Sequence, residues 1–128
     1  MYLPGLEACI RDGNVASIMC SYNAVNGIPS CANSFLQDTI AREQWGFEDY
    51  IVSDCGAINS IEKSHQGVIN LSTIHNTAGL LGGCDLNCGS YYQTHGMEAI
   101  NSKTITEEDV DVRAGMGRST LVLVLKDT

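Results

Sequence analysis

The sequence predicts an α/β fold whose strands run parallel, as a sheet or as part of a barrel. Apolar runs at residues 15–20 and 50–53 have the length and the β-branched content of buried strands. Stretches with helical spacing of apolar residues alternate with these runs, as crossover helices do in parallel sheets. A barrel of this kind needs eight strands, and the sequence offers about three. We therefore expect a fragment of a larger α/β domain.

The N-terminal quarter predicts a helix, a strand and a turn-rich loop. Leu6 and Ile10 lie on one face of a short helix expected over residues 3–12, and a Gly-Asn pair ends it. The continuous apolar run from Val15 to Cys20 predicts a buried strand. Asn, Gly and Pro punctuate residues 21–32, which are therefore expected to form turns.

A second helix and a second strand follow. Ser34 and Gln37 have the spacing of a capping box, which predicts a helix that starts here and continues to Trp45. The apolar residues that recur at helical spacing in it are Phe35, Leu36, Ile40 and Ala41. We expect Trp45 to pack in the core rather than to serve as a platform for a sugar ring. Tyr50–Ser53 is the second strand.

The C-terminal half predicts three helices and a short strand. A weak helix is expected over residues 69–81 and a third strand over Gly83–Leu86. Another helix is expected over Tyr91–Ser102. Thr106 and Asp109 again have capping-box spacing, so a last helix should start at Thr106.

Composition excludes several classes of partner. The 128 residues carry a formal net charge of −8, which argues against binding to nucleic acid or to an anionic membrane. The apolar run Leu121–Leu125 is far too short to span a bilayer. The first residues lack the basic and apolar regions of a signal peptide, so we expect either a cytosolic protein or a sequence whose start is missing. Six cysteines exceed ordinary usage and favour an oxidising compartment.

A carboxylate at the end of a strand is the strongest indication of a functional site. It is Asp54, in the run Tyr50-Ile51-Val52-Ser53-Asp54-Cys55-Gly56. A buried parallel strand can deliver such a side chain to the edge where ligands bind. An Asp in this position also commonly caps the next helix or accepts a bond from a loop amide. The pattern alone leaves both interpretations open.

Four ordered motifs add a resemblance. They are Ser17-Ile18-Met19-Cys20-Ser21-Tyr22-Asn23-Ala24-Val25-Asn26-Gly27-Ile28-Pro29, Gln44-Trp45-Gly46-Phe47, Ile51-Val52-Ser53-Asp54-Cys55-Gly56 and Gly83-Cys84-Asp85-Leu86-Asn87-Cys88-Gly89. Together they resemble glycoside hydrolase family 3, and the β-xylosidase and α-arabinofuranosidase-like branch more than the β-glucosidases. The resemblance covers most of residues 2–118.

The resemblance implies a fold and a chemistry. The chain would be the last part, roughly three strand-helix units, of the family's N-terminal TIM-like barrel domain. Asp54 would be the catalytic nucleophile, which forms a covalent glycosyl-enzyme that water then displaces with net retention. Tyr22 matches a tyrosine beside the nucleophile that could hydrogen-bond to it or to the sugar.

Two features of the family have no match in this sequence. Its general acid/base is a Glu from a second, C-terminal domain, and its Lys-His pair for sugar hydroxyls lies on an earlier strand. Lys63 and His65 are not that pair, because they follow Asp54 in the sequence. Retaining hydrolysis needs two carboxyl groups about 5 Å apart. The isolated chain is therefore expected to be inactive.

The cysteines allow several arrangements. Cys55 and Cys88 would lie on neighbouring loops, and Cys20 and Cys31 flank the turn-rich segment, so each couple is a candidate disulfide. Connectivity cannot be read from sequence, and any of these residues could instead be a buried thiol. Cys9 and Cys84 have the setting of core positions.

The sequence gives little support for a metal site, a thiol nucleophile or a second catalytic acid. A zinc site at Cys84 and Cys88 with a histidine lacks the usual repeated Cys-x-x-Cys spacing. Cys55 acting as a nucleophile with His65 or His75 has no supporting local signature. Asp85 more plausibly braces a loop than performs chemistry.

Two surface features complete the candidates. The acidic residues at the start of the last helix, Glu107, Glu108, Asp109 and Asp111, are expected to be solvated and favoured by the helix dipole. Asn70 begins the glycosylation triplet Asn70-Leu71-Ser72.

The expected function is that of a secreted retaining glycosidase fragment acting on terminal β-xylosyl or related pentosyl residues. Its partners would be an oligosaccharide or glycoside substrate and the missing remainder of the barrel and second domain, with no cofactor and no metal. A catalytically inactive remnant that binds a glycan or a protein is the alternative. A module held together by disulfides or a metal is a third hypothesis.

Overall fold

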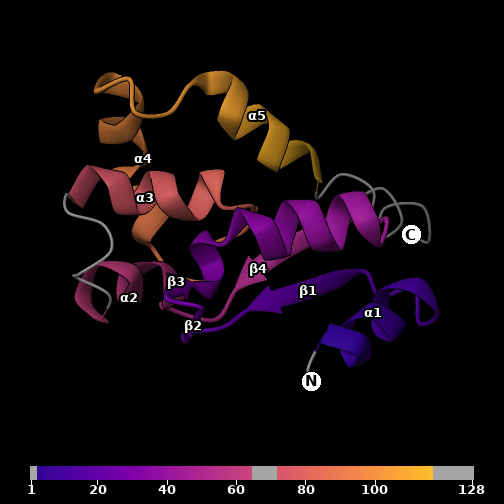
Figure 1. Ribbon diagram of the computed structural model, residues 1–128. Helices are drawn as coiled ribbons and strands as arrows, with labels where there is room; N and C mark the ends of the chain where they lie inside the picture. Colours follow the sequence, from indigo (N-terminus) through magenta and orange to yellow (C-terminus); the bar gives the residue numbers. More distant parts are fainter. Residues whose placement is uncertain (1–2, 65–71, 117–128) are drawn as a thin grey trace.

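The computed structural model describes residues 3–64 and 72–116 and has an α/β fold. Figure 1 shows the elements in order. They are α1 (Leu3–Arg11), β1 (Ser17–Cys20), β2 (Ala24–Val25), β3 (Ile28–Pro29), the 3₁₀ helix η1 (Ser30–Ala32), the π-helix η2 (Phe35–Gln44), β4 (Tyr50–Ser53), α2 (Ala57–Ser64), α3 (Ser72–Leu81), α4 (Tyr91–Asn101) and α5 (Glu107–Met116).

Two parallel strands form the centre of the fold. β1 pairs with β4 in a register that runs from Ser17–Tyr50 to Cys20–Ser53. Beyond β4, the predicted third strand is reduced to one parallel bridge between Val52 and Leu86. The physical reason is that the Asp85 carboxylate accepts the Ile51 N–H, at 2.7 Å, in place of a strand carbonyl. A side chain thus replaces part of the ladder.

The turn-rich segment contains a small hairpin that the sequence analysis did not resolve. β2 and β3 pair antiparallel, with Ala24 opposite Pro29 and Val25 opposite Ile28. Asn26 and Gly27 between them both have positive φ, 53° and 83°. This is the turn chemistry that suits the twist of a two-residue hairpin.

The helix after this hairpin begins differently from the prediction. The capping box of Ser34 and Gln37 is wrong, because Ser34 already has helical dihedrals and makes no side-chain cap. Asn33 takes that role, since its side-chain oxygen accepts the N–H of Leu36 at 3.2 Å. The Gln37 amide instead donates to the carbonyls of Ser30 and Gly82, at 3.2 and 2.7 Å.

The wider turn of η2 also changes which residues it buries. Its hydrogen bonds reach five residues back, as in the bond from Trp45 N–H to the Ile40 carbonyl at 3.0 Å. The 3.6-residue spacing used for the prediction therefore misplaces Phe35, which is 59% exposed, while Ala41 is buried as expected. Trp45 packs against the core, as predicted.

Helix α1 buries a single position of its predicted face. Ile10 is buried, but Leu6 is 39% exposed. The prediction that Cys9 is a core residue is wrong, because its thiol is exposed. Side chains of neighbouring residues diverge on a helix, so burying Ile10 turns Cys9 away from the strands.

The C-terminal helices agree better with their predictions. α4 lies within one residue of the expected range. The capping box at α5 is confirmed: the Thr106 N–H donates to an Asp109 carboxylate oxygen at 2.8 Å, and the Asp109 N–H donates to the Thr106 hydroxyl at 3.1 Å. Glu107, Glu108 and Asp111 are exposed, as expected. Helix α2 was not predicted.

Three apolar clusters hold these elements together. One joins α1, η2 and β4 through Ile10, Ala41 and Ile51. A second joins the end of β1, η1 and α2. The third joins α3, α4 and the start of α5. In Figure 1, η2 lies along the two strands, and α1 lies near the N-terminal end of β1.

Among residues 3–64 and 72–116, no helix is long and apolar enough to cross a membrane. The glycosylation candidate Asn70 and the histidine His65 lie outside the described residues, as does the side chain of His75.

Candidate active site

Asp54 lies where β4 ends, at the carboxyl edge of the two parallel strands. Its N–H donates to the Cys20 carbonyl at 2.9 Å, which continues the β1–β4 ladder by one residue. Its carbonyl accepts the N–H of Ala57, at 2.9 Å, as α2 begins. The carboxylate is half-buried, and one oxygen accepts the N–H of Cys55 at 2.7 Å. This geometry fixes the backbone and leaves the carboxylate partly accessible.

Tyr22 reaches the same edge from the segment that follows β1. Its hydroxyl donates a hydrogen bond to the carbonyl of Cys55, the residue directly after Asp54. The tyrosine is 48% exposed. Because β1 and β4 run parallel, their carboxyl ends meet, and this brings Tyr22 and Asp54 into one neighbourhood.

A set of contacts between residues 53–56 and 86–88 brackets Asp54. We call it the 53–88 clamp. The Ser53 N–H donates to the Leu86 carbonyl at 2.8 Å, and the Cys88 N–H donates to the Ser53 hydroxyl oxygen at 3.0 Å. The Gly56 N–H donates to the Cys88 carbonyl at 2.8 Å. The clamp therefore fixes the backbone on both sides of the aspartate.

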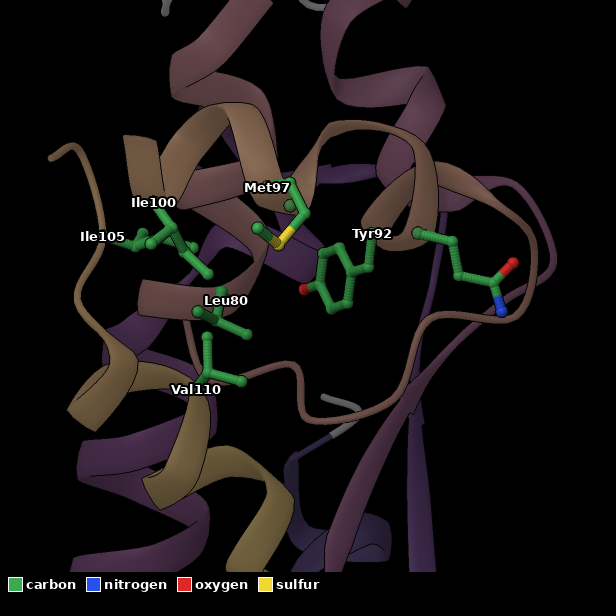
Figure 2. Close-up of a pocket in the computed structure, with 8 residues that line it drawn as sticks. Leu80, Tyr92, Met97, Ile100, Ile105 and Val110 are labelled. Atoms are coloured by element: carbon green, nitrogen blue, oxygen red, sulfur yellow. The ribbon is translucent and has the colours of Figure 1, made fainter. Parts of the chain in front are cut away.

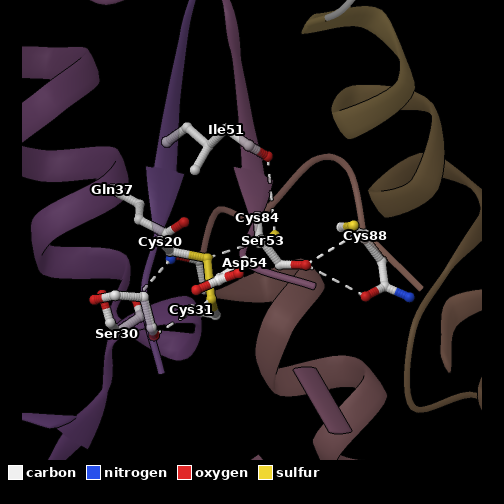
Figure 3. The surroundings of a disulfide bond; sticks show 12 residues. Cys20, Ser30, Cys31, Gln37, Ile51, Ser53, Asp54, Cys84 and Cys88 are labelled. Atoms are coloured by element: carbon white, nitrogen blue, oxygen red, sulfur yellow. Dashed lines mark hydrogen bonds between the residues drawn. A yellow bond between two sulfur atoms is a disulfide. The ribbon is translucent and has the colours of Figure 1, made fainter. Parts of the chain in front are cut away.

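The clamp has a polar and a covalent component. The Ser53 hydroxyl, on a residue that is 1% exposed, also lies 3.3 Å from the side-chain oxygen of Asn87. A disulfide joins Cys55 to Cys88 across a sequence separation of 33 residues. Figure 3 shows Ser53, Asp54 and Cys88 together. Sequence reasoning missed the roles of Ser53 and Asn87, because their partners are distant in the chain.

A second disulfide holds the β2–β3 hairpin against the end of β1. It joins Cys20 and Cys31, with a Cα–Cα distance of 5.1 Å. Both disulfides join cysteines that the sequence analysis named as candidate pairs. Since Cys55 and Cys88 are bonded to each other, neither provides a thiol for the alternative zinc site or for a thiol nucleophile.

Asp85 is a structural acid, as predicted. Its side chain is 3% exposed and pairs with the Arg42 guanidinium at 2.5 Å and with that of Arg113 at 3.7 Å. Burial raises the pKa of Asp85, while the Ile51 N–H and the two guanidinium groups oppose that rise. One Asp85 oxygen accepts bonds from Arg42 and from the Ile51 N–H, and the other is buried without a hydrogen bond to any described residue, 3.7 Å from Arg113, so Asp85 braces β4.

The C-terminal helices line an open apolar pocket of about 280 Å³, shown in Figure 2. Its lining includes Leu80 from α3, Tyr92 and Met97 from α4 and Val110 from α5. None of the predicted site residues lines it. Among the described residues, no group of three or more His, Cys, Asp and Glu side chains has an arrangement that could hold a metal ion.

The family follows from comparison with known sequences. Residues 1–115 match the family described as "Glycosyl hydrolase family 3 N terminal domain". The chain belongs to glycosyl hydrolase family 3. Within family 3, it is 44% identical over 110 residues to the probable β-D-xylosidase 7 of Arabidopsis thaliana, covering 86% of this chain and 14% of that protein. It is 39% identical over 112 residues to the probable exo-1,4-β-xylosidase xlnD of Aspergillus terreus, with the same coverage.

Solved structures of family 3 agree with the fold. A GH3 exo-β-xylosidase (XlnD), in complex with a xylobiose aziridine activity-based probe, superimposes with a TM-score of 0.79 and 34% sequence identity. The superposition covers 90% of this chain and 16% of that chain. The chain therefore has the fold of one part of a family 3 enzyme and spans about one seventh of the length of the curated relatives it matches.

Proposed function

We propose that this chain carries the nucleophile of a retaining glycoside hydrolase that releases terminal β-xylosyl or related pentosyl residues. The observation that carries the proposal is Asp54, a partly accessible carboxylate held at the carboxyl edge of parallel strands by the 53–88 clamp. That edge is where the enzymes of parallel α/β barrels place their catalytic groups. The matched family 3 relatives include proteins named as xylosidases, which supports a pentoside as the substrate.

Asp54 would attack the anomeric carbon of the bound glycoside while the leaving oxygen is protonated. The resulting glycosyl ester would then be opened by water with net retention of configuration. Tyr22, whose hydroxyl bonds to the carbonyl after Asp54, would hold the nucleophile segment and face the sugar from the β1 side.

The chemistry needs a second carboxyl group about 5 Å from the first. Asp85, the other strand-end acid, is engaged by two guanidinium groups and the Ile51 N–H. We propose that the acid/base comes from a second domain of the parent protein. Residues 1–128 would then be the C-terminal part of a TIM-like barrel domain, with β1, β4 and the Leu86 bridge as successive barrel positions.

The parent protein is proposed to be extracellular. Two disulfides form and persist in oxidising compartments, and they are uncommon in cytosolic proteins.

The nucleophile can be tested in a chimera in which residues 1–115 replace the matching segment of the Arabidopsis thaliana xylosidase. After incubation with an activated 2-fluoro-xyloside, intact mass and peptide mapping should show one fluoroxylosyl group, on Asp54. The Asp54→Asn chimera should gain no mass. A folded chimera that acquires the label on another residue would contradict the assignment.

A non-catalytic remnant is the rival function. A folded chimera that gains no label, while the unmodified xylosidase does, would favour the remnant. In that case binding of the 128-residue chain to xylo-oligosaccharides, measured by calorimetry, tests whether a glycan-binding role remains.

A further inference from the structure

Three sulfur atoms meet in the core beneath the β2–β3 hairpin. Cys20 and Cys31 form a disulfide, and the Cys84 sulfur lies 3.9 Å from that of Cys20. The three residues are 5%, 1% and 0% exposed. Figure 3 shows the Cys84 thiol beside the disulfide. Cys84 comes from the segment before Leu86, 64 residues from Cys20 in sequence.

We propose that Cys84 is an internal exchange thiol for the Cys20–Cys31 disulfide. In this step the Cys84 thiolate attacks the Cys20 sulfur, a Cys20–Cys84 bond forms, and the Cys20–Cys31 bond breaks. Cys31 leaves as a thiolate and takes up the proton that Cys84 gave to the solvent. The number of disulfides is unchanged, so the step needs neither an oxidant nor a reductant.

Packing keeps the exchange slow in the resting fold. A disulfide has sulfur atoms about 2 Å apart, so Cys84 must approach by a further 2 Å or so. Its sulfur also lies within hydrogen-bonding reach of the carbonyls of Leu86, at 3.6 Å, and Ile51, at 3.8 Å. A thiol that donates to one of these carbonyls is in the protonated form, which is not the nucleophilic form.

The charged and polar groups around Cys84 set its response to pH. Burial raises the pKa of its thiol to about 12, and the Asp85 carboxylate adds to that rise. The Tyr92 hydroxyl and the Arg113 guanidinium act in the opposite direction. Because only the thiolate reacts, the exchange rate should rise about tenfold for each pH unit below that pKa.

The exchange would act on the region around Asp54. The Cys20–Cys31 bond closes the segment that carries Tyr22 and the hairpin. Once Cys20 is bonded to Cys84, Cys31 is free and the hairpin segment is no longer held to the end of β1 by a disulfide. Thiol chemistry in the core would then loosen the element that places Tyr22 on the Cys55 carbonyl. This inference does not depend on the proposed glycosidase function.

The test uses the full 128-residue chain carrying Cys9→Ser, since the exposed Cys9 thiol could attack the disulfide of another molecule. The chain is incubated from pH 7 to pH 10 without oxygen or added thiol, quenched in acid, alkylated and mapped without reduction. We expect a Cys20–Cys84 peptide and newly alkylated Cys31. The rate should rise about tenfold per pH unit and be independent of chain concentration.

The controls are Cys84→Ala and, should that variant fail to fold by circular dichroism, Cys84→Ser in the same background. Both should keep Cys20 bonded to Cys31 throughout. The proposal is overturned if no Cys20–Cys84 peptide forms by pH 10. It is also overturned if Cys84 couples to Cys31 instead, or if Cys31 is released as fast in the control.

Discussion

At the scale of single residues, Ser53 makes the contacts that position Asp54. Its side chain is small and buried, and its hydroxyl receives the Cys88 N–H while lying against Asn87. Ser53 directly precedes the aspartate in β4, so any displacement of its backbone moves Asp54 as well. A serine in this place is a positioning residue for the strand end.

Ser53→Ala should destabilise the chain. The substitution leaves the partly buried Cys88 N–H without its acceptor, which typically costs about 1–3 kcal/mol. Urea unfolding of the 128-residue chain measures the change in the free energy of unfolding. Ser60→Ala is the matched control, because the Ser60 hydroxyl bonds to the Gly56 carbonyl within its own helix turn. Its loss should change the free energy of unfolding by less than about 0.5 kcal/mol. Equal effects of the two substitutions would argue against the role of Ser53.

At the scale of elements, the caps and disulfides decide where each segment starts and how it is held. The Thr106–Asp109 capping box was predictable, because both partners lie within one helical turn. The cap of η2 was not, because Asn33 competes with Ser34 for the same role, and the outcome depends on where the 3₁₀ helix before it ends.

The α5 cap gives a prediction for pH. Hydrogen bonds from the Thr106 hydroxyl and backbone N–H lower the pKa of Asp109. A lowered folded-state pKa means that the cap stabilises α5 above the ordinary carboxyl pKa and is lost as pH falls through the folded value. Thr106→Ala should raise the Asp109 pKa, measured by carboxyl NMR titration. Thr104→Ala is the control: it removes a hydroxyl that bonds to Ser102 and not to Asp109, so the Asp109 pKa should stay unchanged.

The Cys55–Cys88 disulfide gives a prediction for stability. It closes 33 residues, and loss of such a cross-link typically costs about 2–4 kcal/mol. The Cys55→Ser/Cys88→Ser double variant should therefore unfold at a lower urea concentration than the parent chain. If the double variant unfolds at the same urea midpoint as the parent chain, the covalent part of the 53–88 clamp is dispensable.

At the scale of the whole molecule, a cluster of four charges ties distant segments together. Arg113 on α5 forms two parallel bonds with Asp38 on η2, at 2.9 and 3.0 Å, across 75 residues of sequence. Asp85 and Arg42 complete the cluster beside β4. Two carboxylates and two guanidinium groups balance each other, which allows the charges to lie largely out of solvent.

Arg113→Ala should lower the free energy of unfolding by about 1.5–3 kcal/mol, because it removes both hydrogen bonds to the Asp38 carboxylate and the ion pair with Asp85. Arg113→Lys keeps the charge but not the two parallel hydrogen bonds. Its free energy of unfolding should therefore lie between those of the parent chain and of Arg113→Ala. Thermal or urea unfolding provides the comparison. Glu7→Gln, which removes only the exposed pair with Arg11, should change stability by about 0.5 kcal/mol or less.

The sequence by itself determined the features that arise within a few neighbouring residues. β4, α4 and the α5 cap follow from local apolar spacing and from hydrogen bonds three residues apart. The position of Asp54 after a strand is equally local. Local patterns can be read because the interacting groups are close in the chain whatever the rest of the molecule does.

The tertiary structure decided what depends on segments that meet only after folding. It turned Cys9 to the surface, widened η2, and replaced the third strand with a bridge completed by the Asp85 side chain. It also brought Ser53 to Cys88 and Tyr22 to the Cys55 carbonyl. Burial and long-range hydrogen bonds select among locally acceptable conformations, so these contacts could not be read from spacing.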